Sequence, residues 1–301
     1  MNNICVVGDG AWGKALAHVA RQAGNDVTFW SRQNTAERNV AAAEAVILAV
    51  PAQAVRGVAS QLPLQGKDVI IAAKGIERGS GLMMVDVVAA CAPTARSLVL
   101  SGPSFATDVL KGLPTAVTLA AETLAVAGIW AQRLSAPRFR IYQSDDRRGV
   151  EIGGALKNVL AIACGIADGR GFGDSARAAL TTRGFAELVR LGEAMGARRE
   201  TLMGLSGLGD LMLTCASPQS RNYAFGRAIG RGDSVATALT RVNGVVEGVA
   251  TALVAVELAL RHGIDLPITR AVHMIIDDGA SPADVISELL ARPALSEFLK
   301  E

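Results

Sequence analysis

A glycine-rich turn near the start of the chain constrains the fold more than any other feature. The apolar run from Ile4 to Val7 leads into Gly8-Asp-Gly10-Ala-Trp-Gly13, and a helical pattern follows from Lys14 to Ala23. Glycines at this spacing permit a tight strand-to-helix turn and let the backbone approach a pyrophosphate at the helix N-terminus. Alone the motif is weak, but between a strand and a helix it predicts a dinucleotide-binding fold.

The apolar runs that follow indicate a largely parallel sheet. A second strand is predicted at residues 26–30, and further runs alternate with helical stretches at residues 45–50, 69–73, 98–100, 115–119 and 139–142. Residues 31–44 hold one helix at most and leave no room for another strand and crossover. We expect one unit of the usual doubly wound sheet to be missing, and the sheet domain to close near Ser144.

Two residues at the end of the second predicted strand bear on the choice of cofactor. An NAD-selective site usually places an acidic residue there for the ribose hydroxyls, whereas Ser31 and Arg32 can accept a 2′-phosphate. The pattern favours NADP(H), with NAD(H) possible. Arg32 as a solvent-facing loop charge is the alternative.

From Asp145 onward, helical patterns separated by Gly, Pro and Asp replace the strand-like runs. They include residues 151–165, 175–195, 223–229, 246–262 and 282–290. We therefore predict a dinucleotide-binding domain at residues 1–144 and an all-α substrate domain at residues 145–301.

Lys157 stands out in the first of these helices, because the chain has only six lysines and this one has small and apolar neighbours at helical spacing. Gly153 and Gly154 cost the helix about 1 kcal/mol each relative to alanine. We interpret them as leaving space for a ligand beside Lys157. The alternative is a surface lysine that snorkels to water.

Two loops at predicted strand ends also carry polar groups. Lys74 follows the run at residues 69–73, and Ser101-Gly-Pro-Ser104 follows the run at residues 98–100. Ligands of such sheets lie beyond the carboxyl ends of the strands, so both loops are expected to face the cofactor. The second loop is equally well explained as a turn followed by a helix cap.

The centre of the helical half combines a carboxylate with a possible phosphate site. Asp210 lies at a probable helix start, and Ser220-Arg221-Asn222 follows. An arginine suits two-pronged phosphate binding, and its neighbours can add neutral hydrogen bonds. These residues indicate a small phosphorylated substrate, although Arg221 could also be a surface arginine beside a helix cap.

Composition argues against several other classes of protein. The net charge is +2 over 301 residues, with basic and acidic residues interspersed, so nothing marks a nucleic-acid or membrane surface. The longest charge-free apolar stretches are interrupted before the roughly 18 residues that suggest a membrane span. The four cysteines and three histidines show no metal-binding spacing, and the cysteines are expected to be reduced core residues. The start of the chain reads as a strand rather than a signal peptide, which favours the cytoplasm.

Taken together and in order, these motifs resemble the bacterial-type NAD(P)-dependent glycerol-3-phosphate dehydrogenases. The segments that carry the resemblance are Gly8–Gly13, Ala73–Glu77, Ser101–Phe105, Gly154–Asn158, Gly207–Asp210, Ser220–Asn222 and Val245–Gly248. The resemblance spans most of the chain. It implies an α/β Rossmann-type dinucleotide-binding domain followed by an all-α domain like that of 6-phosphogluconate dehydrogenases.

The resemblance also implies a reaction and its residues. The enzyme would interconvert dihydroxyacetone phosphate and sn-glycerol 3-phosphate with NAD(P)H and supply glycerol 3-phosphate for phospholipid synthesis. Lys157 would accept the proton in oxidation and donate it in reduction, and Asp210 would orient Lys157 if it reaches it. The implied substrate residues are Lys74, Gly102, Ser104, Lys157, Asp210, Ser220, Arg221 and Asn222. The expected cofactor residues are Gly8, Gly10, Ala11, Trp12, Gly13, Arg32, Lys74, Ala106, Arg221, Val245 and Glu247.

The chain departs from the family pattern in two places. The segment from Arg32 to Glu44 is shorter than usual, which affects the wall around the adenosine half of the cofactor, and Asp9 stands where alanine is common. An acidic side chain in the phosphate turn lowers cofactor affinity unless it points to solvent.

Three other interpretations stay open. A same-fold reductase of another small 2-keto substrate would not need Ser220-Arg221-Asn222. A non-catalytic NAD(P)-binding sensor would use Lys157 only structurally. An interaction protein could use the apolar helical half as a dimer surface, and a homodimer is also compatible with catalysis.

Overall fold

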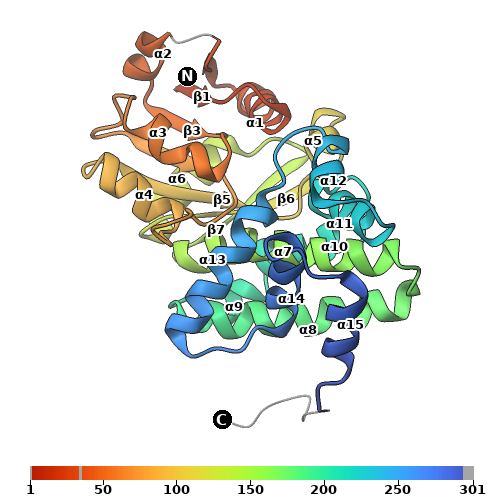
Figure 1. Cartoon of the computed structure of the whole chain (residues 1–301). Coiled ribbons are helices and arrows are strands. Elements are labelled where there is room, and N and C mark those ends of the chain that lie inside the picture. Colours follow the sequence, from red (N-terminus) through yellow and green to blue (C-terminus); the bar gives the residue numbers. More distant parts are fainter. Residues whose placement is uncertain (1, 34–35, 294–301) are drawn as a thin grey trace.

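A seven-stranded sheet forms the first half of the chain, and packed helices form the second half (Figure 1). The computed structural model describes residues 2–33 and 36–293. The strand order is β2-β1-β3-β4-β5-β6-β7, and neighbouring strands are parallel except for the antiparallel pair β5 and β6. This arrangement confirms the predicted Rossmann-type sheet with a following helical region.

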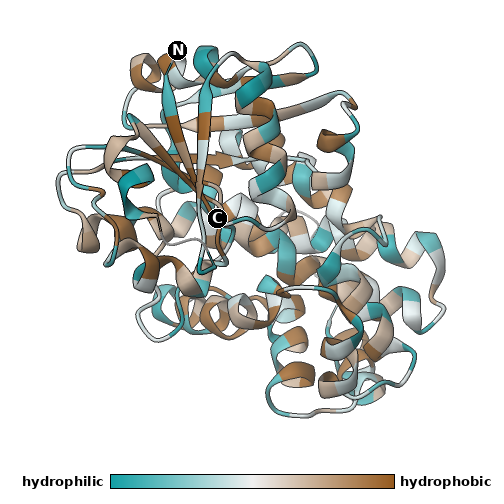
Figure 2. Ribbon diagram, turned by 90° about the horizontal axis from the view of Figure 1, so that it is seen from above, coloured by the Kyte–Doolittle hydropathy of each residue, from teal (hydrophilic) through white to brown (hydrophobic). Residues whose placement is uncertain are grey.

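Each strand lies at one of the predicted apolar runs. The strands are β1 (Asn3–Val7), β2 (Asp26–Trp30), β3 (Ala45–Leu48), β4 (Asp68–Ile71), β5 (Arg96–Ser101), β6 (Thr115–Ala120) and β7 (Phe139–Ser144). Every residue of β3 and β4 is buried, because helices cover both faces of the sheet. Figure 2 shows brown, hydrophobic stretches along the strands of the sheet and on the helices beside them.

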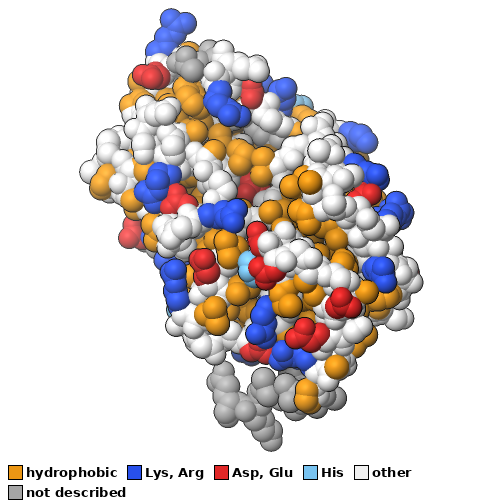
Figure 3. Space-filling view, viewed as in Figure 1, with side chains coloured by type: hydrophobic (Ala, Val, Ile, Leu, Met, Phe, Trp, Pro, Cys, Tyr) orange, Lys and Arg blue, Asp and Glu red, His pale blue; other side chains and the backbone are white. Residues whose placement is uncertain are grey.

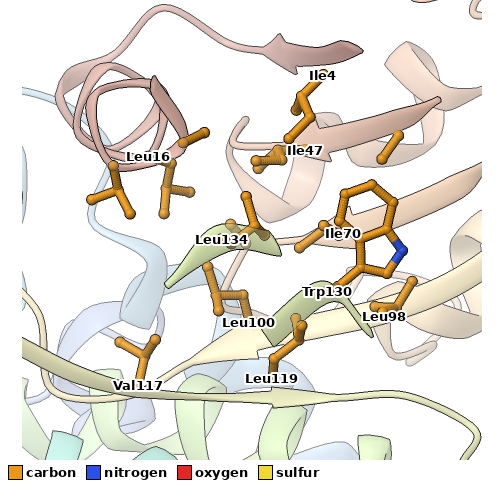
Figure 4. Packing of buried hydrophobic residues seen from close by; sticks show 14 of the residues in the cluster. Ile4, Leu16, Ile47, Ile70, Leu98, Leu100, Val117, Leu119, Trp130 and Leu134 are labelled. Carbon is orange, nitrogen blue, oxygen red and sulfur yellow. The ribbon is translucent and has the colours of Figure 1, made fainter. Parts of the chain in front are cut away.

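Two hydrophobic layers attach the helices to the sheet. The helices of this half are α1 (Ala11–Gln22), α2 (Glu37–Ala42), α3 (Val55–Ala59), α4 (Met84–Cys91), α5 (Ala106–Leu110) and α6 (Leu124–Leu134), with the 3₁₀ helix η1 (Ala52–Ala54). Leu16 of α1 and Trp130 of α6 pack on Ile47 and Ile70 on one face (Figure 4). Helices α2, α3 and α4 cover the other face. The two layers fix the carboxyl ends of the strands, where the predicted ligand loops begin.

The sheet ends at β2, as the short connection predicted. Between β2 and β3 the described residues form only the six-residue helix α2, with no further strand, and residues 34 and 35 of this connection lie outside the described ranges. Because β2 pairs only with β1 in the described sheet, it forms an edge beside the glycine-rich turn.

The helical half is built around α7 (Arg147–Gly169). Its other elements are α8 (Gly173–Ala194), α9 (Arg199–Leu202), the π-helix η2 (Leu205–Gly209), α10 (Asp210–Cys215), α11 (Arg221–Gly230), α12 (Val235–Arg241), α13 (Glu247–His262), α14 (Pro267–Ile276) and α15 (Pro282–Leu290). No strand follows Ser144 in the part of the chain that the structure describes, as predicted. The division into domains at residues 144 and 145 stays a prediction.

Helix α7 is long and apolar enough to cross a membrane, but its most apolar stretch is entirely buried inside the protein. Helices α8, α10, α11 and α13 pack around it. Helix α7 is therefore the core of the helical half, and Lys157 lies near its middle. On the face shown in Figure 3, basic and acidic side chains are interspersed.

Glycines let α7 and α11 pack backbone to backbone. A Cβ atom at Gly226 of α11 would lie 2.1 Å from the carbonyl oxygen of Ile162, and one at Gly165 of α7 would lie 2.2 Å from that of Tyr223. Neither carbonyl can move without breaking its helix. The two helices therefore depend on these positions having no side chain.

We expect Gly226→Ala to lower the free energy of unfolding by about 1–3 kcal/mol or more, the usual range for overpacking. Urea denaturation followed by circular dichroism measures this effect. The matched control is Gly57→Ala in α3, where an added Cβ meets nothing within 4 Å. Because alanine favours a helix over glycine, this control should be neutral or stabilising. Equal effects of the two substitutions would contradict the close-packing argument.

Candidate active site

One buried carboxylate holds two lysines that come from different halves of the chain. Lys157 Nζ donates to Asp210 Oδ1 at 2.6 Å, and Lys74 Nζ donates to Asp210 Oδ2 at 2.7 Å. The exposed fraction is 7% for Lys157 and 1% for Asp210. The structure thus confirms that Asp210 reaches Lys157, and it places Lys74, which lies 83 residues earlier in the sequence than Lys157, at the same carboxylate.

Burial and charge act in opposite directions on Lys157. Desolvation lowers the pKa of its ammonium, the carboxylate of Asp210 raises it, and the positive charge of Lys74 lowers it, which brings the pKa from 10.5 to about 8. An amine with a pKa of about 8 can both donate and accept a proton near neutral pH. This property suits a general acid and base.

A helix start and a π-helical turn position the carboxylate. The π-helix η2 ends at Gly209, and Asp210 is the first residue of α10, as the sequence predicted. Thr214, one turn later, accepts a hydrogen bond from Lys157 Nζ at 2.9 Å and donates one to the carbonyl of Asp210 at 2.6 Å. Sequence reasoning missed Thr214, although its place four residues after Asp210 was a usable signal.

The two strand-end loops meet each other at Lys74. Lys74 follows β4, and its Nζ also donates to the carbonyl of Gly102, which follows β5, at 3.1 Å. Gly102 has a φ of +147°, and a side chain there would strike the backbone of Val117. Ser104 Oγ donates to the same carbonyl at 3.0 Å, while α5 begins at Ala106 without a side-chain cap. The loop is a turn, but Ser104 is not its helix cap.

Helix α7 approaches η2 and the end of β5 through its glycines, for a reason different from the one predicted. A Cβ at Gly153 would lie 2.7 Å from the carbonyl oxygen of Ser206, and a Cβ at Gly154 would lie 2.5 Å from Ser101 Oγ. The space beside these glycines is filled by the protein itself. The prediction that they leave room for a ligand is therefore wrong, since they let η2 and the β5 loop contact α7.

The predicted cluster Ser220-Arg221-Asn222 divides into three different roles. Ser220 Oγ accepts a hydrogen bond from the backbone N–H of Tyr223 at 3.2 Å and caps α11. Asn222 donates to Asn158 Oδ1 and accepts from the backbone N–H of Gly248, both at 2.9 Å. Both side chains are buried. The hydrogen bonds of Asn222 hold α7, α11 and α13 together.

Arg221 differs from its two neighbours because its side chain is exposed. Its Nη1 lies 2.6 Å from where a Cβ at Gly244 would be, so the guanidinium covers the loop before α13. Among the described residues it has no hydrogen-bond partner. Of the three residues, Arg221 is the one whose side chain is exposed to an anion from solution.

Asn158 connects Asn222 to Lys74. The sequence prediction did not single out Asn158. Its Nδ2 donates to the backbone carbonyl of Lys74 at 3.3 Å, and its Oδ1 accepts from Asn222. Its place next to Lys157, one residue further along α7, was the available signal. Asn158 fixes the backbone of Lys74 relative to the helix that carries Lys157.

The glycine-rich turn fits a pyrophosphate. A Cβ at Gly13 would lie 2.0 Å from the carbonyl oxygen of Gly8, and one at Gly8, whose φ is +109°, would lie 2.6 Å from that of Ala49. Over Gly10, the N-cap of α1, an added Cβ would meet nothing within 4 Å. The turn is thus closely packed at Gly8 and Gly13 and open over Gly10, where the N-terminus of α1 attracts an anion. Asp9 in this turn is exposed.

The other predicted cofactor residues lie on several elements. Ala11, Arg32 and Val245 are exposed, and Trp12 and Ala106 are half-buried. Glu247 Oε1 accepts from the backbone N–H of Ala52 in η1 at 3.1 Å, and burial raises the pKa of its carboxyl group. The described residues contain no cluster of His, Cys, Asp or Glu side chains that could hold a metal ion.

Known proteins resemble this chain over nearly its whole length. The model for the N-terminal part of NAD-dependent glycerol-3-phosphate dehydrogenases matches residues 3–40 and 32–127, and the model for the C-terminal part matches residues 146–287. A protein of Parvibaculum lavamentivorans named glycerol-3-phosphate dehydrogenase [NAD(P)+] is 50% identical, and one of Bradyrhizobium with the same name is 48% identical, each over 98% of both chains.

A solved structure shares the fold as well as the sequence. The glycerol-3-phosphate dehydrogenase of Coxiella burnetii superposes with a TM-score of 0.92 at 36% identity, covering 97% of this chain and 99% of the other. The two pieces of the N-terminal match overlap at residues 32–40. The match to the N-terminal model is therefore broken into two pieces within the short connection between β2 and β3. The matches to both family models and to these relatives show that the chain belongs to the NAD-dependent glycerol-3-phosphate dehydrogenase family.

Proposed function

We propose that this protein interconverts dihydroxyacetone phosphate and sn-glycerol 3-phosphate with a nicotinamide cofactor, with Lys157 as its general acid and base. The observation that carries the proposal is the buried arrangement of Lys157, Asp210 and Lys74. Membership of the family supports the choice of substrate. Supply of glycerol 3-phosphate for phospholipid synthesis follows from that choice.

The proposed mechanism depends on where positive charge lies. A bound nicotinamide cofactor would supply hydride to C2 of the ketone, and negative charge would then develop on the ketone oxygen. The Lys157 ammonium donates a hydrogen bond to that oxygen and then its proton, and the Lys74 ammonium stabilises the same charge. Asp210 keeps both ammonium groups in place. In oxidation, neutral Lys157 accepts the proton from the C2 hydroxyl.

Arg221 is the proposed phosphate ligand. Its guanidinium is exposed, and the Asn222–Asn158 hydrogen bond links the start of its helix to the turn of α7 that carries Lys157. A phosphate held at one end fixes the distance of C2 from Lys157. Ser220 and Asn222, which the sequence suggested as further ligands, are buried and would support Arg221 by fixing the start of its helix.

NADP(H) is the favoured cofactor in this proposal, with NAD(H) as the alternative. Arg32 is exposed at the end of the edge strand β2, and no acidic residue takes the place that usually contacts the ribose hydroxyls. The names of the relatives, which include NAD(P)+, support either cofactor.

A homodimer in the cytoplasm is the proposed form of the enzyme. Large apolar side chains are exposed on the helical half, and they support association with a second copy. They include Met203, Met212, Leu260 and Leu290.

Lys157→Ala should reduce turnover about a hundredfold or more, because the general acid is lost, while NADPH binding stays nearly unchanged. The assay follows loss of NADPH absorbance with and without dihydroxyacetone phosphate, and fluorescence titration follows NADPH binding. The control is Lys111→Ala, an exposed lysine at the end of α5. Near-normal turnover of Lys157→Ala would refute the assignment, and an inactive wild type would favour a non-catalytic sensor.

The two directions of the reaction should depend oppositely on pH. Reduction needs charged Lys157, so its kcat/KM should fall as the pH rises through about 8, whereas oxidation needs the neutral amine, so its kcat/KM should rise up to that pH and then level off. Because Asp210 raises the pKa of Lys157, Asp210→Asn should move both midpoints to lower pH. Profiles of kcat/KM against pH in each direction test this, and a shift of the midpoints to higher pH would contradict it.

Arg221→Ala should raise the KM for dihydroxyacetone phosphate tenfold or more, since a charged hydrogen bond contributes about 1.5–3 kcal/mol. Steady-state kinetics at saturating NADPH measure the change. Arg231→Ala, at the exposed opposite end of the same helix, is the matched control and should behave as wild type. An unchanged KM in Arg221→Ala would favour a reductase of a non-phosphorylated 2-keto substrate.

A further inference from the structure

Residues 72–83 connect β4 to α4 and form the loop that carries Lys74. Two residues of the helical half hold Lys74 directly, since Asp210 binds its ammonium group and Asn158 binds its backbone carbonyl. Beyond Lys74 the loop is held from the sheet half, by side chains of η1 and α3. The proposed reaction uses Lys74 but gives no role to the side chains of η1 or α3.

One side chain of η1 binds the backbone of the Lys74 loop at two points. Gln53 Nε2 donates to the carbonyl oxygen of Ile76 at 2.7 Å, and Gln53 Oε1 accepts from the backbone N–H of Arg78 at 3.0 Å. Its amide group thus uses a donor and an acceptor on the same stretch of chain. Ile76 is fully buried and lies two residues after Lys74. Gln53 therefore fixes both the position and the direction of the backbone next to Lys74.

A glycine brings the Lys74 loop into close contact with η1. A Cβ atom at Gly75, the residue after Lys74, would lie 2.7 Å from the Cβ atom of Ala52. The helix η1 is in turn held by α13, because Glu247 Oε1 accepts from the backbone N–H of Ala52 at 3.1 Å. Gln53 thus extends from an element that is itself fixed, and it reaches the loop where the loop and η1 already touch.

A second contact keeps the loop attached to α3. Arg56 donates from Nε and Nη2 to the two carboxylate oxygens of Glu77, each at 2.8 Å. This pair stays when the side chain of Gln53 is removed. Gln53 is also exposed, so its truncation leaves no cavity in the core. A variant without the Gln53 amide is therefore expected to fold, with only the hydrogen bonds to Ile76 and Arg78 lost.

We propose that Gln53 is a positioning residue, which sets the place of the Lys74 ammonium group through the backbone of residues 76–78. The proposal rests on the proposed function, in which Lys74 stabilises the charge on the ketone oxygen. A misplacement of about 1 Å at such a site can cost a hundredfold in rate. Gln53 acts through Lys74 and is not itself a catalytic residue.

The place of Lys74 also affects the protonation of Lys157. The charged groups that act on Lys157 are Asp210 and Lys74, and Cys215 is a further titratable group beside it. The positive charge of Lys74 lowers the pKa of Lys157. When the Lys74 ammonium moves away, the pKa of Lys157 should rise. The midpoint of the pH profile should then move to higher pH, in the direction opposite to the effect of Asp210→Asn.

The kinetic test compares Gln53→Ala with the wild type in the reduction of dihydroxyacetone phosphate by NADPH. We expect kcat/KM of Gln53→Ala to fall about tenfold or more, and its pH midpoint to move to higher pH. The matched control is Gln61→Ala, which removes an exposed glutamine shortly after α3 and should behave as the wild type. Circular dichroism checks that both variants are folded.

A second measurement follows Lys74 without any turnover. Acetic anhydride acylates accessible amines, and mass spectrometry of peptides gives the rate at each lysine. The side chain of Lys74 is 16% exposed, so it should react slowly in the wild type and several times faster in Gln53→Ala. Lys111, which is exposed at the end of α5, is the internal reference and should react at the same rate in both proteins.

Two results would overturn the proposal. An unchanged acylation rate at Lys74 in Gln53→Ala would show that Gln53 does not place the ammonium group. A pH midpoint equal to that of the wild type would show the same, even if kcat/KM falls, because a general disturbance of the fold lowers activity without moving the charge of Lys74 alone. If the wild type does not turn over dihydroxyacetone phosphate, the proposed function fails, but acylation still decides whether Gln53 positions Lys74. The two failures are therefore distinguishable.

Discussion

The carboxylate of Asp210 is the interaction on which the arrangement of the site depends. It lies inside the protein and binds an ammonium group from the helical half and another from the sheet half. An unpaired charge in such a place costs several kcal/mol, so each of the three charged groups requires the others. The loop after β4 must therefore meet α7 and α10 at one point.

Small residues make that meeting possible. Gly153 and Gly154 let η2 and the β5 loop touch α7, while Gly165 and Gly226 bring α7 and α11 together. Hydrogen bonds then fix the backbones that have come close, from Asn158 to Lys74 and from Asn222 to Asn158 and Gly248. The same packing buries Lys157 and lowers the pKa of its ammonium group. Tight packing and acid–base chemistry thus have a common origin.

Local patterns predicted much of the architecture. All seven strands lie at apolar runs that the sequence displays, and β2 and α15 have the predicted bounds. Strands buried on both faces need uninterrupted apolar residues, so the pattern is strong. The missing unit after β2 followed from counting residues. Asp210 was recognised at a helix start, and its contact with Lys157 was predicted on condition that it could reach the lysine.

The sequence by itself determined the order of strands and helices, the dinucleotide turn and the residue types at the site, because these follow from local periodicity and local backbone geometry. Only the tertiary structure decided the role of each polar side chain. Ser220 caps a helix, Asn222 bonds Asn158 and Gly248 inside the protein, and Thr214 contacts Lys157. Whether a side chain keeps a free donor depends on groups 26 or 64 residues away in the chain, as Gly248 and Asn158 are from Asn222. Such contacts arise from packing, which no local pattern encodes.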